Sequence, residues 1–414
     1  MASLGHQVVA VDVNPQKVEL FKTGVVPFFE PGLAELLGTA KTQSNLTFTT
    51  DYSDAAACDI HFLCIGTPQT ENGLQADLSA LESAFHSVIE IAHAGSLIVG
   101  KSTVPVGTAE RFSTVLAERK PSVTLNWNPE FLREGHAITD TLRPNRIVIG
   151  TNTTNGGAKL ENFYKEVSPE APIFVTNFST AELVKVAANA FLATKISFIN
   201  AMSEVADATG ADVALLADAI GADDRIGRKF LGSGIGFGGG CLPKDIRAFL
   251  ARADELGLAD SLNFLREFDL INQRARTRAV AVALRELGDP KGKKVAVLGA
   301  AFKPDRDDVR DSPALEIAAT LHALGALVVV HDPRALESAA AKTPDLKYSS
   351  SIEETLAHAD LTMHLTEWNE YRALDPALMK KLVNVPTIFD GRNVLDVSKW
   401  QSAGWKLLAL GRTL

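Results

Sequence analysis

Residues 4–12 of the chain read LGHQVVAVD, and residues 324–332 read LGALVVVHD. In both stretches a glycine precedes a short run rich in valine, and an aspartate ends the stretch. A glycine suits the end of a helix because it adopts the left-handed conformation easily. An acidic residue at the carboxyl end of the second strand is typical of a dinucleotide-binding unit. The repeat therefore predicts two similar α/β units, one near each end of the chain.

Short strands alternate with helical patterns around both stretches, which indicates parallel sheets. Between them, two long helical patterns predict a helical region, at Ala181–Thr209 and Ser261–Leu287. We therefore expect an α/β fold with two Rossmann-like parallel-sheet domains, residues 1–178 and 289–414, joined by a helical region, residues 179–288. The expected strands are Gln7–Asp12, Asp59–Ile65, Ser96–Val99, Thr124–Trp127, Arg146–Ile149, Lys294–Leu298, Leu327–His331, Leu361–Leu365 and Thr387–Phe389.

The first copy of the repeat lacks sequence that precedes the second copy. A strand at Lys294–Leu298 and a loop at residues 299–301 come before Gly325, whereas only four residues precede Gly5. A Rossmann unit places its phosphate-binding glycine loop about 20 residues before the acidic residue. We therefore expect the first unit to be N-terminally incomplete, and favour a start assigned at an internal methionine over a natural truncation.

Composition limits the classes of partner. The 414 residues are 46% hydrophobic and 22% charged, as in ordinary globular proteins. A net charge of -9 argues against nucleic acid and against an anionic membrane surface as partners. Three cysteines are too few and too scattered for a disulfide framework or a zinc site, so no metal is expected. No signal peptide or long apolar run is visible, and a reducing cytoplasm fits best.

The strongest local signal is the segment GFGGGCLPKD at residues 236–245. Glycine clusters let a backbone approach a ligand closely and offer N–H groups to its oxygens. Cys241 follows the glycines, and a cation at Lys244 would favour its thiolate. If Pro243 begins a helix, the positive helix N-terminus would help as well. The segment therefore predicts a nucleophilic cysteine rather than a buried structural one.

With this segment the chain resembles the UDP-glucose 6-dehydrogenase family, within the wider UDP-glucose/GDP-mannose dehydrogenase group. The resemblance covers essentially the whole sequence. Its remaining motifs are VDVN (residues 11–14), FFEPGL (28–33), GTP (66–68), KSTVPVGT (101–108), NPEFLREG (128–135), Glu182-x-x-Lys185-x-x-x-Asn189, FKPD (302–305) with Arg310, and DGR (390–392).

The resemblance implies two NAD-dependent oxidations of a sugar alcohol to a uronic acid. Cys241 would attack the intermediate aldehyde, and the resulting thiohemiacetal would be oxidised to a thioester that water releases. Lys185 and Asn189, four residues apart, would stabilise the developing alkoxide, unless they form a solvated polar face. Asp245 with a water would be the base, and Glu130 would assist hydrolysis, although Glu130 and Glu134 also suit a first helical turn. The catalytic residues implied are Cys241, Lys185, Asn189, Asp245, Glu130 and Thr103.

Binding roles follow from the same resemblance. Asp12 would take the adenosine ribose hydroxyls and favour NAD over NADP. Arg225 matches an arginine that in this family reaches the substrate from the neighbouring subunit. The active site would then be shared within a homodimer, and residues 179–288 would be its helical dimerisation region. The remaining cofactor contacts would be Lys17, Thr67, Thr103, Glu134, Lys244 and Arg310. The nucleotide-sugar contacts would be Glu130, Phe131, Leu132, Lys185, Asn189, Arg225, Phe230, Leu231, Gly232, Ser233, Gly234, Gly238, Lys303 and Arg392.

Three alternatives stay open. GDP-mannose 6-dehydrogenases share the cysteine loop, although the FFEPG segment and Arg225-Ile226-Gly227 favour UDP-glucose. Enzymes of UDP-N-acetylmannosamine, with a different loop around the cysteine, fit less well. The chain as written could also bind a nucleotide sugar without turnover, because the expected phosphate loop is absent from it. One departure from the pattern, Gly240 where many members carry serine, is expected to matter little.

Overall fold

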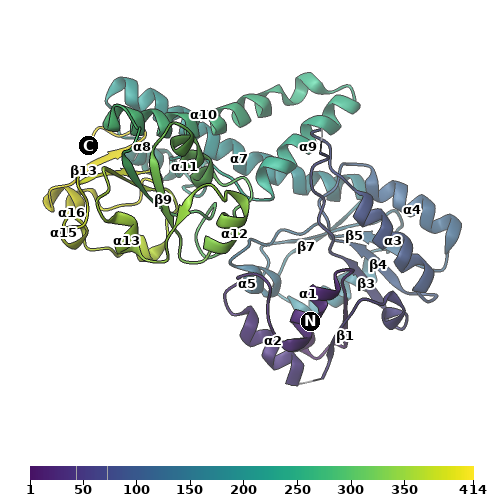
Figure 1. The fold of residues 1–414 in the computed structure, drawn as a ribbon. Helices are drawn as coiled ribbons and strands as arrows, with labels where there is room; N and C mark the ends of the chain where they lie inside the picture. The colour runs from purple at the N-terminus through teal and green to yellow at the C-terminus, as the bar shows by residue number, and fades with distance from the viewer. Residues whose placement is uncertain (43, 72) are drawn as a thin grey trace. The chain divides into compact units, whose positions relative to one another are not determined.

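The computed structural model describes residues 1–42, 44–71 and 73–414. They form two compact units (Figure 1). The first unit comprises Met1–Ala188 and Lys244–Leu258, and the second comprises Asn189–Pro243 and Ala259–Leu414. The three-part division at residues 178 and 288 stays a prediction. Among the described residues, none of the helices has the length and apolar character that crossing a bilayer requires.

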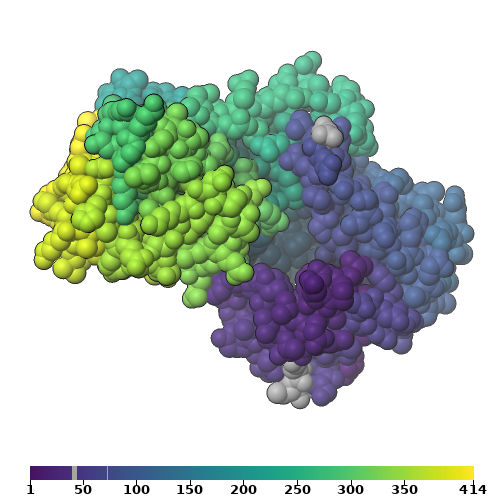
Figure 2. Space-filling model, viewed as in Figure 1, coloured from purple at the N-terminus to yellow at the C-terminus, as the bar shows by residue number. Residues whose placement is uncertain are grey.

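The first unit holds two groups of strands. Its larger sheet, as far as the structure describes it, has the order β3 (Ile60–Leu63), β4 (Leu97–Gly100), β5 (Thr124–Trp127), β6 (Ile147–Gly150) and β7 (Ile173–Thr176). The pairs in this sheet are parallel except β5 with β6, which meet antiparallel at Trp127 and Gly150. A separate parallel pair joins β1 (Val8–Val11) to β2 (Leu46–Thr49). Figure 2 shows this purple N-terminal part at the surface.

Successive strand residues point to opposite faces of a sheet, so the larger sheet has apolar side chains on both faces. Helices cover each face. Helices α3 (Ser79–Ile91) and α4 (Thr108–Arg119) bury Ile98, and the rings of Phe85 and Phe112 stack 4.3 Å apart between them. Helix α6 (Ala158–Val167) covers Leu97 and Val99 on the other face. The shorter helices α1 (Pro15–Thr23), α2 (Leu33–Thr42) and α5 (Ala137–Leu142) complete this part of the chain.

The second unit contains a sheet in which all described pairs are parallel. Its order is β10 (Lys347–Tyr348), β9 (Leu327–His331), β8 (Lys294–Leu298), β11 (Leu361–His364), β12 (Thr387–Asp390) and β13 (Lys406–Ala409). One face packs against α10 (Asn263–Leu287) and α11 (Pro313–Ala323). The other face packs against α13 (Ile352–Leu356), α15 (Pro376–Met379) and α16 (Val397–Ser402), where Trp400 and Trp405 are buried. This strand order is that of a doubly wound dinucleotide-binding fold.

The remaining helices are α7 (Phe178–Thr209), α8 (Val213–Gly221), α9 (Leu242–Glu255), α12 (Leu336–Lys342) and α14 (Asn369–Arg372). Helices α7 and α10 confirm the two long helical patterns, and all nine expected strands are present with ends shifted by at most about two residues. Four strands were missed: β2, β7, β10 and β13. Strand β7 shows why, because Phe174 and Val175 are both exposed there and the expected alternation is lost.

The two glycines of the repeat have the same backbone conformation. Gly5 ends a short 3-10 helix with φ 93°, and Gly325 precedes β9 with φ 97°. Each lies in the left-handed region that glycine tolerates best. The repeat seen in the sequence is therefore a repeat in structure, with β1 equivalent to β9. The expectation that the first unit is N-terminally incomplete stays a prediction.

Candidate active site

The aspartate of the repeat has a different role in each copy. Asp12 follows β1, accepts a hydrogen bond from the Asn14 N–H at 3.0 Å and pairs with the Lys17 ammonium at 2.5 Å. Burial alone would raise the pKa of Asp12, but Lys17 and the Asn14 N–H hold it below its ordinary value. The Asp12 side chain is 32% exposed, so an ionised carboxylate remains accessible to the diol of a ribose.

Asp332, in the second copy, is 2% exposed. One carboxylate oxygen accepts the N–H groups of Ala300 and Ala301, and the other accepts those of Arg334 and Ala335. The Trp368 indole also donates to it. The Asp332 carboxylate therefore holds together the loops that follow β8 and β9. The first unit, with Asp12, is therefore the one that fits a dinucleotide.

Several predicted residues meet in one pocket of the first unit. Thr67 donates its hydroxyl to the Thr103 carbonyl at 2.8 Å. The Lys244 ammonium lies 2.6 Å from the Asp245 carboxylate and 3.5 Å from the Thr67 hydroxyl. Apolar side chains surround them, so polar groups converge in a largely apolar hollow, as small-molecule sites require. The pocket is lined by Thr67, Pro68, Gln69, Ala76, Thr103, Val104, Pro105, Val106, Val186, Lys244, Asp245, Ala248, Phe249 and Arg252.

A buried carboxylate ties this pocket to helix α7. Glu182, 1% exposed, accepts the N–H groups of Gly107 and Ala109 at 2.7 Å each, at the start of α4. Burial raises the pKa of Glu182 despite those two donors. The contact fixes the 103–107 loop against the turn of α7 that carries Lys185. Glu182 was part of the motif Glu182-x-x-Lys185, but the spacing of that motif did not predict its contact with the start of α4.

Glu130, Phe131 and Lys185 also lie together in the first unit. One Glu130 oxygen accepts the N–H groups of Phe131 and Leu132 at 2.7 and 2.8 Å. The other oxygen lies 3.0 Å from the Lys101 ammonium. The Lys185 ammonium lies 5.4 Å from the centre of the Phe131 ring, within the range of a cation–π contact. Lys101 was not among the predicted site residues.

The segment that includes Glu134 is anchored from the FFEPGL motif. The Glu30 carboxylate accepts the N–H groups of Gly135 and Ala137 at 2.7 Å each. Arg133, beside Glu134, forms a bidentate pair with Asp140 at 2.8 and 2.9 Å. Both contacts hold the backbone on either side of Glu134. The Glu30 anchor gives the motif a structural reason for its acid.

The cysteine loop is packed tightly inside the second unit. A Cβ added at Gly239 would come within 2.6 Å of the Phe302 ring, and one at Gly240 within 2.3 Å of the Arg310 guanidinium. The loop glycines therefore serve close internal packing as well as any approach to a ligand. Cys241 itself is exposed and directly precedes α9. A serine at position 240 would displace the Arg310 guanidinium, which is the far end of a flexible side chain, so the expectation that this position matters little stays a prediction.

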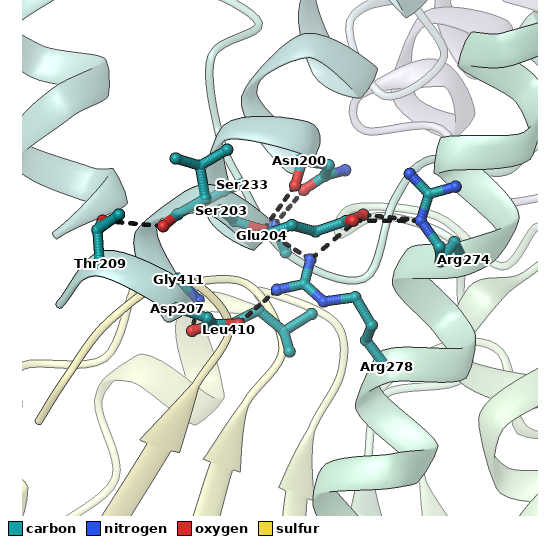
Figure 3. Close-up of polar contacts among 12 residues, drawn as sticks. Asn200, Ser203, Glu204, Asp207, Thr209, Ser233, Arg274, Arg278, Leu410 and Gly411 are labelled. Carbon is teal, nitrogen blue, oxygen red and sulfur yellow. Dashed lines mark hydrogen bonds and ion pairs between the residues drawn. The ribbon is translucent and has the colours of Figure 1, made fainter. Parts of the chain in front are cut away.

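The loop at residues 230–234 is held by helix α7. Asn200 is fully buried and its side-chain Oδ1 accepts the Gly234 N–H at 2.9 Å. Ser233 is 6% exposed and accepts the Asn393 amide at 3.0 Å. Figure 3 shows Asn200 beside Ser203, whose hydroxyl accepts from Arg278. The loop is thus fixed to the inner face of α7.

Arg392 joins three backbone segments of the second unit. Its guanidinium donates to the carbonyls of Leu365, Gly236 and Phe302 at 2.7, 2.9 and 3.1 Å. The Lys303 ammonium lies 5.4 Å from the Phe302 ring centre. Arg392 therefore organises the loops at the carboxyl ends of β8 and β11, where ligands of doubly wound folds bind.

Arg225 is an exposed residue of the second unit. Its side chain is 88% exposed and pairs with Asp223 at 2.6 Å. By unit, the predicted residues divide as follows. The first unit holds Asp12, Lys17, Thr67, Thr103, Glu130, Phe131, Leu132, Glu134, Lys185, Lys244 and Asp245, and the second holds Asn189, Arg225, Phe230–Gly234, Gly238, Cys241, Lys303, Arg310 and Arg392.

Comparison with known proteins agrees with this division of roles. Residues 1–168 match the NAD binding domain of the UDP-glucose/GDP-mannose dehydrogenase family, residues 179–274 its central domain and residues 296–397 its UDP binding domain. The chain belongs to the UDP-glucose/GDP-mannose dehydrogenase family. It is therefore an NAD-dependent oxidoreductase of this type, and the NAD-binding match falls on the part of the chain that carries Asp12.

Relatives support the same family. UDP-glucose 6-dehydrogenase TuaD of Bacillus subtilis is 39% identical over 99% of this chain and 89% of its own length. A UDP-glucose dehydrogenase structure from Pyrobaculum islandicum is 38% identical, with a TM-score of 0.90 over 100% of this chain and 94% of that chain. A GDP-mannose dehydrogenase from Pseudomonas aeruginosa is 27% identical, with a TM-score of 0.52 over 98% of this chain and 95% of that chain.

Proposed function

We propose that the protein oxidises UDP-glucose to UDP-glucuronate in two NAD-dependent steps, through a covalent intermediate on Cys241. The observation that carries the proposal is Cys241 itself, exposed on a rigid glycine loop at the start of α9. A helix N-terminus favours a thiolate over a thiol. The two adjacent residues Lys244 and Asp245 lie in the first turns of that helix.

In the first step the C6 hydroxyl loses its proton and the C6 carbon loses a hydride. NAD, when bound, takes up the hydride. Lys185 and Asn189 project from the same side of α7 and stabilise the alkoxide that develops at O6. Asp245, 3% exposed and paired with Lys244, receives the proton through a water.

In the second step the Cys241 thiolate attacks the aldehyde carbon and forms a thiohemiacetal. A second NAD, when bound, would take up the hydride that leaves this carbon, and loss of the hydroxyl proton then gives a thioester on Cys241. Water then attacks the thioester, the carbon–sulfur bond breaks, and the thiolate and the free acid are released. Glu130 orients that water, since two backbone N–H groups hold its carboxylate.

The preference for UDP-glucose over GDP-mannose rests on the relatives and on the FFEPGL motif, whose Glu30 anchors the backbone beside Glu134. The loop at residues 230–234, with Lys303 and Arg392, would hold the nucleotide sugar. A reducing cytoplasm suits the reaction because an oxidised Cys241 could not attack a carbonyl.

The test is turnover by the purified protein with NAD and either UDP-glucose or GDP-mannose. We expect two NADH per UDP-glucose consumed and a kcat/KM for UDP-glucose at least about tenfold above that for GDP-mannose. Release of UDP-glucuronate is measured by chromatography. A preference for GDP-mannose, or one NADH per sugar with free aldehyde as product, would contradict the proposal.

We also propose that the protein is a homodimer that meets along α7. Phe191, Phe198 and Val205 are spaced seven residues apart and are 65%, 42% and 53% exposed. A spacing of seven keeps side chains on one helical face, and such a stripe packs well against a second helix of the same kind. Exposed apolar side chains gathered in this way mark protein interfaces.

Replacing Phe198 with glutamate should therefore convert the dimer to a monomer, because two carboxylates would be buried at the interface. Light scattering coupled to size-exclusion chromatography measures the mass. Phe174→Glu is the matched control, since Phe174 is also an exposed phenylalanine, 56% exposed, but lies on β7. A dimer that persists in Phe198→Glu, or dissociates equally in the control, would count against α7 as the interface.

A further inference from the structure

A lysine that the proposed mechanism leaves without a task lies behind Glu130. Lys101 follows β4, while Asn128 and Glu130 follow β5, so all three lie at the carboxyl ends of neighbouring parallel strands. The Lys101 side chain is 14% exposed, against 41% for Glu130. The lysine is therefore the inner partner of the ion pair, and the carboxylate is the outer one.

The Lys101 ammonium is placed by several contacts. It donates to the Asn128 side-chain carbonyl at 3.0 Å and lies 3.5 Å from the Tyr164 hydroxyl. Tyr164 donates to the same Asn128 oxygen at 2.5 Å, and the Asn128 amide donates to the Val148 carbonyl at 2.8 Å. A buried charge with a fixed set of partners is unlike a surface lysine, whose pairings contribute little.

The carboxylate is held on both oxygens. One oxygen accepts two backbone N–H groups, from Phe131 and Leu132, and the other accepts from Lys101. A carboxylate oxygen has room for more than one donor, so Glu130 can still accept a hydrogen bond from a water. Rotation of the carboxylate would break at least two of the present bonds.

We propose that Lys101 is a positioning residue that keeps the Glu130 carboxylate ionised and in one orientation for the hydrolysis of the thioester. The proposal rests on the proposed function, because it gives Glu130 its task in that reaction. Lys101 touches neither the substrate nor the cofactor in this scheme and acts through Glu130 alone.

The charges around the pair agree with this role. Burial would raise the pKa of Glu130, but Lys101 and the N–H groups of Leu132 and Phe131 hold it below its ordinary value. Burial would lower the pKa of Lys101, yet Tyr164 and Glu130 together raise it. The other titratable or charged groups that bear on the pair are the Cys64 thiol, and Arg146 and Lys185, which lie over the Phe131 ring next to Glu130.

Lys101→Met tests the role by removing the charge while keeping the length of the side chain. Without the ammonium, burial should dominate and the pKa of Glu130 should rise. The group is then protonated at higher pH, so the acid limb of turnover should move to higher pH by a similar amount. The pKa is measured by NMR of protein carrying ¹³C-labelled glutamate, with Glu130→Gln to assign the signal.

Three further variants complete the test. Lys101→Arg keeps the charge and should retain a low Glu130 pKa. Lys101→Gln is the alternative neutral variant if methionine does not fold. Lys159→Met is the matched control, because Lys159 also anchors two carbonyls in the first unit, those of Asp59 and Gly95. It should leave both the Glu130 signal and the pH profile unchanged.

The outcomes separate the positioning role from the proposed function. A raised Glu130 pKa in the neutral variants supports the positioning role even if the wild-type protein fails to oxidise UDP-glucose, in which case only the proposed function falls. An unchanged Glu130 pKa in Lys101→Met or Lys101→Gln overturns the positioning role, whatever the activity. A shifted pKa with an unshifted acid limb overturns the part of the role that concerns hydrolysis.

Discussion

Replacing Cys241 with serine is expected to abolish release of the acid, with a loss of roughly 10³-fold or more in the rate of the complete reaction. A serine hydroxyl remains protonated near neutral pH, whereas a cysteine at a helix N-terminus supplies a thiolate. The fold should survive, since Cys241 is exposed and a serine fills nearly the same volume. NADH formed per sugar and UDP-glucuronate released are the quantities to measure.

Cys58→Ser is the matched control, because Cys58 is a second free thiol, half-buried and remote in sequence from the glycine loop. It should keep wild-type turnover. A stalled Cys241→Ser enzyme should also accumulate a product that is oxidised by two electrons, detectable by trapping with a hydrazine. Two NADH per sugar at a near-normal rate in Cys241→Ser would remove the nucleophile from its proposed role.

Much of the fold was predictable because most strands of the described sheets are short β-branched runs between helices. The missed strands β2 and β10 are sheet edges in the described chain, and β7 exposes consecutive apolar residues. Edge strands need only one partner and bury less, so their sequences carry a weaker pattern. The helix that precedes Gly5 and the equivalence of β1 and β9 were predictable, because glycine and aspartate mark their ends.

The predicted site residues came from motifs, and motifs do not reveal what supports them. Lys101 belongs to the KSTVPVGT motif, but its partner Glu130 lies 29 residues away in the sequence. Glu182 belongs to the α7 motif, but the Gly107 N–H that it accepts lies 75 residues away. Asn200 likewise holds the Gly234 N–H from another element. Such contacts depend on tertiary packing. The internal role of the loop glycines was missed for the same reason, since Phe302 and Arg310 lie far along the chain.

Arg225→Ala is expected to weaken UDP-glucose binding and to leave NAD binding nearly unchanged. The Arg225 side chain is 88% exposed and pairs with Asp223 of its own chain. Its removal should therefore disturb the packing of a single protomer little. A guanidinium that reaches across the interface to the phosphates of the substrate would contribute a charge-assisted contact. Losing it should raise the KM for UDP-glucose by about 10–100-fold. Calorimetry with each ligand separates the two affinities.

Mixing the two variants, at a UDP-glucose concentration far below the KM of Arg225→Ala so that each alone is nearly inactive, decides whether the site is shared. A dimer of one Cys241→Ser chain and one Arg225→Ala chain has one site with both native residues if the arginine crosses the interface, and none if it does not. Random exchange at equal concentrations makes half of the dimers mixed, and one site in two of those is intact, so about a quarter of wild-type activity should return. Each variant alone, treated identically, is the control. Exchange is verified with differently tagged chains, and verified exchange without recovery would assign Arg225 to its own subunit.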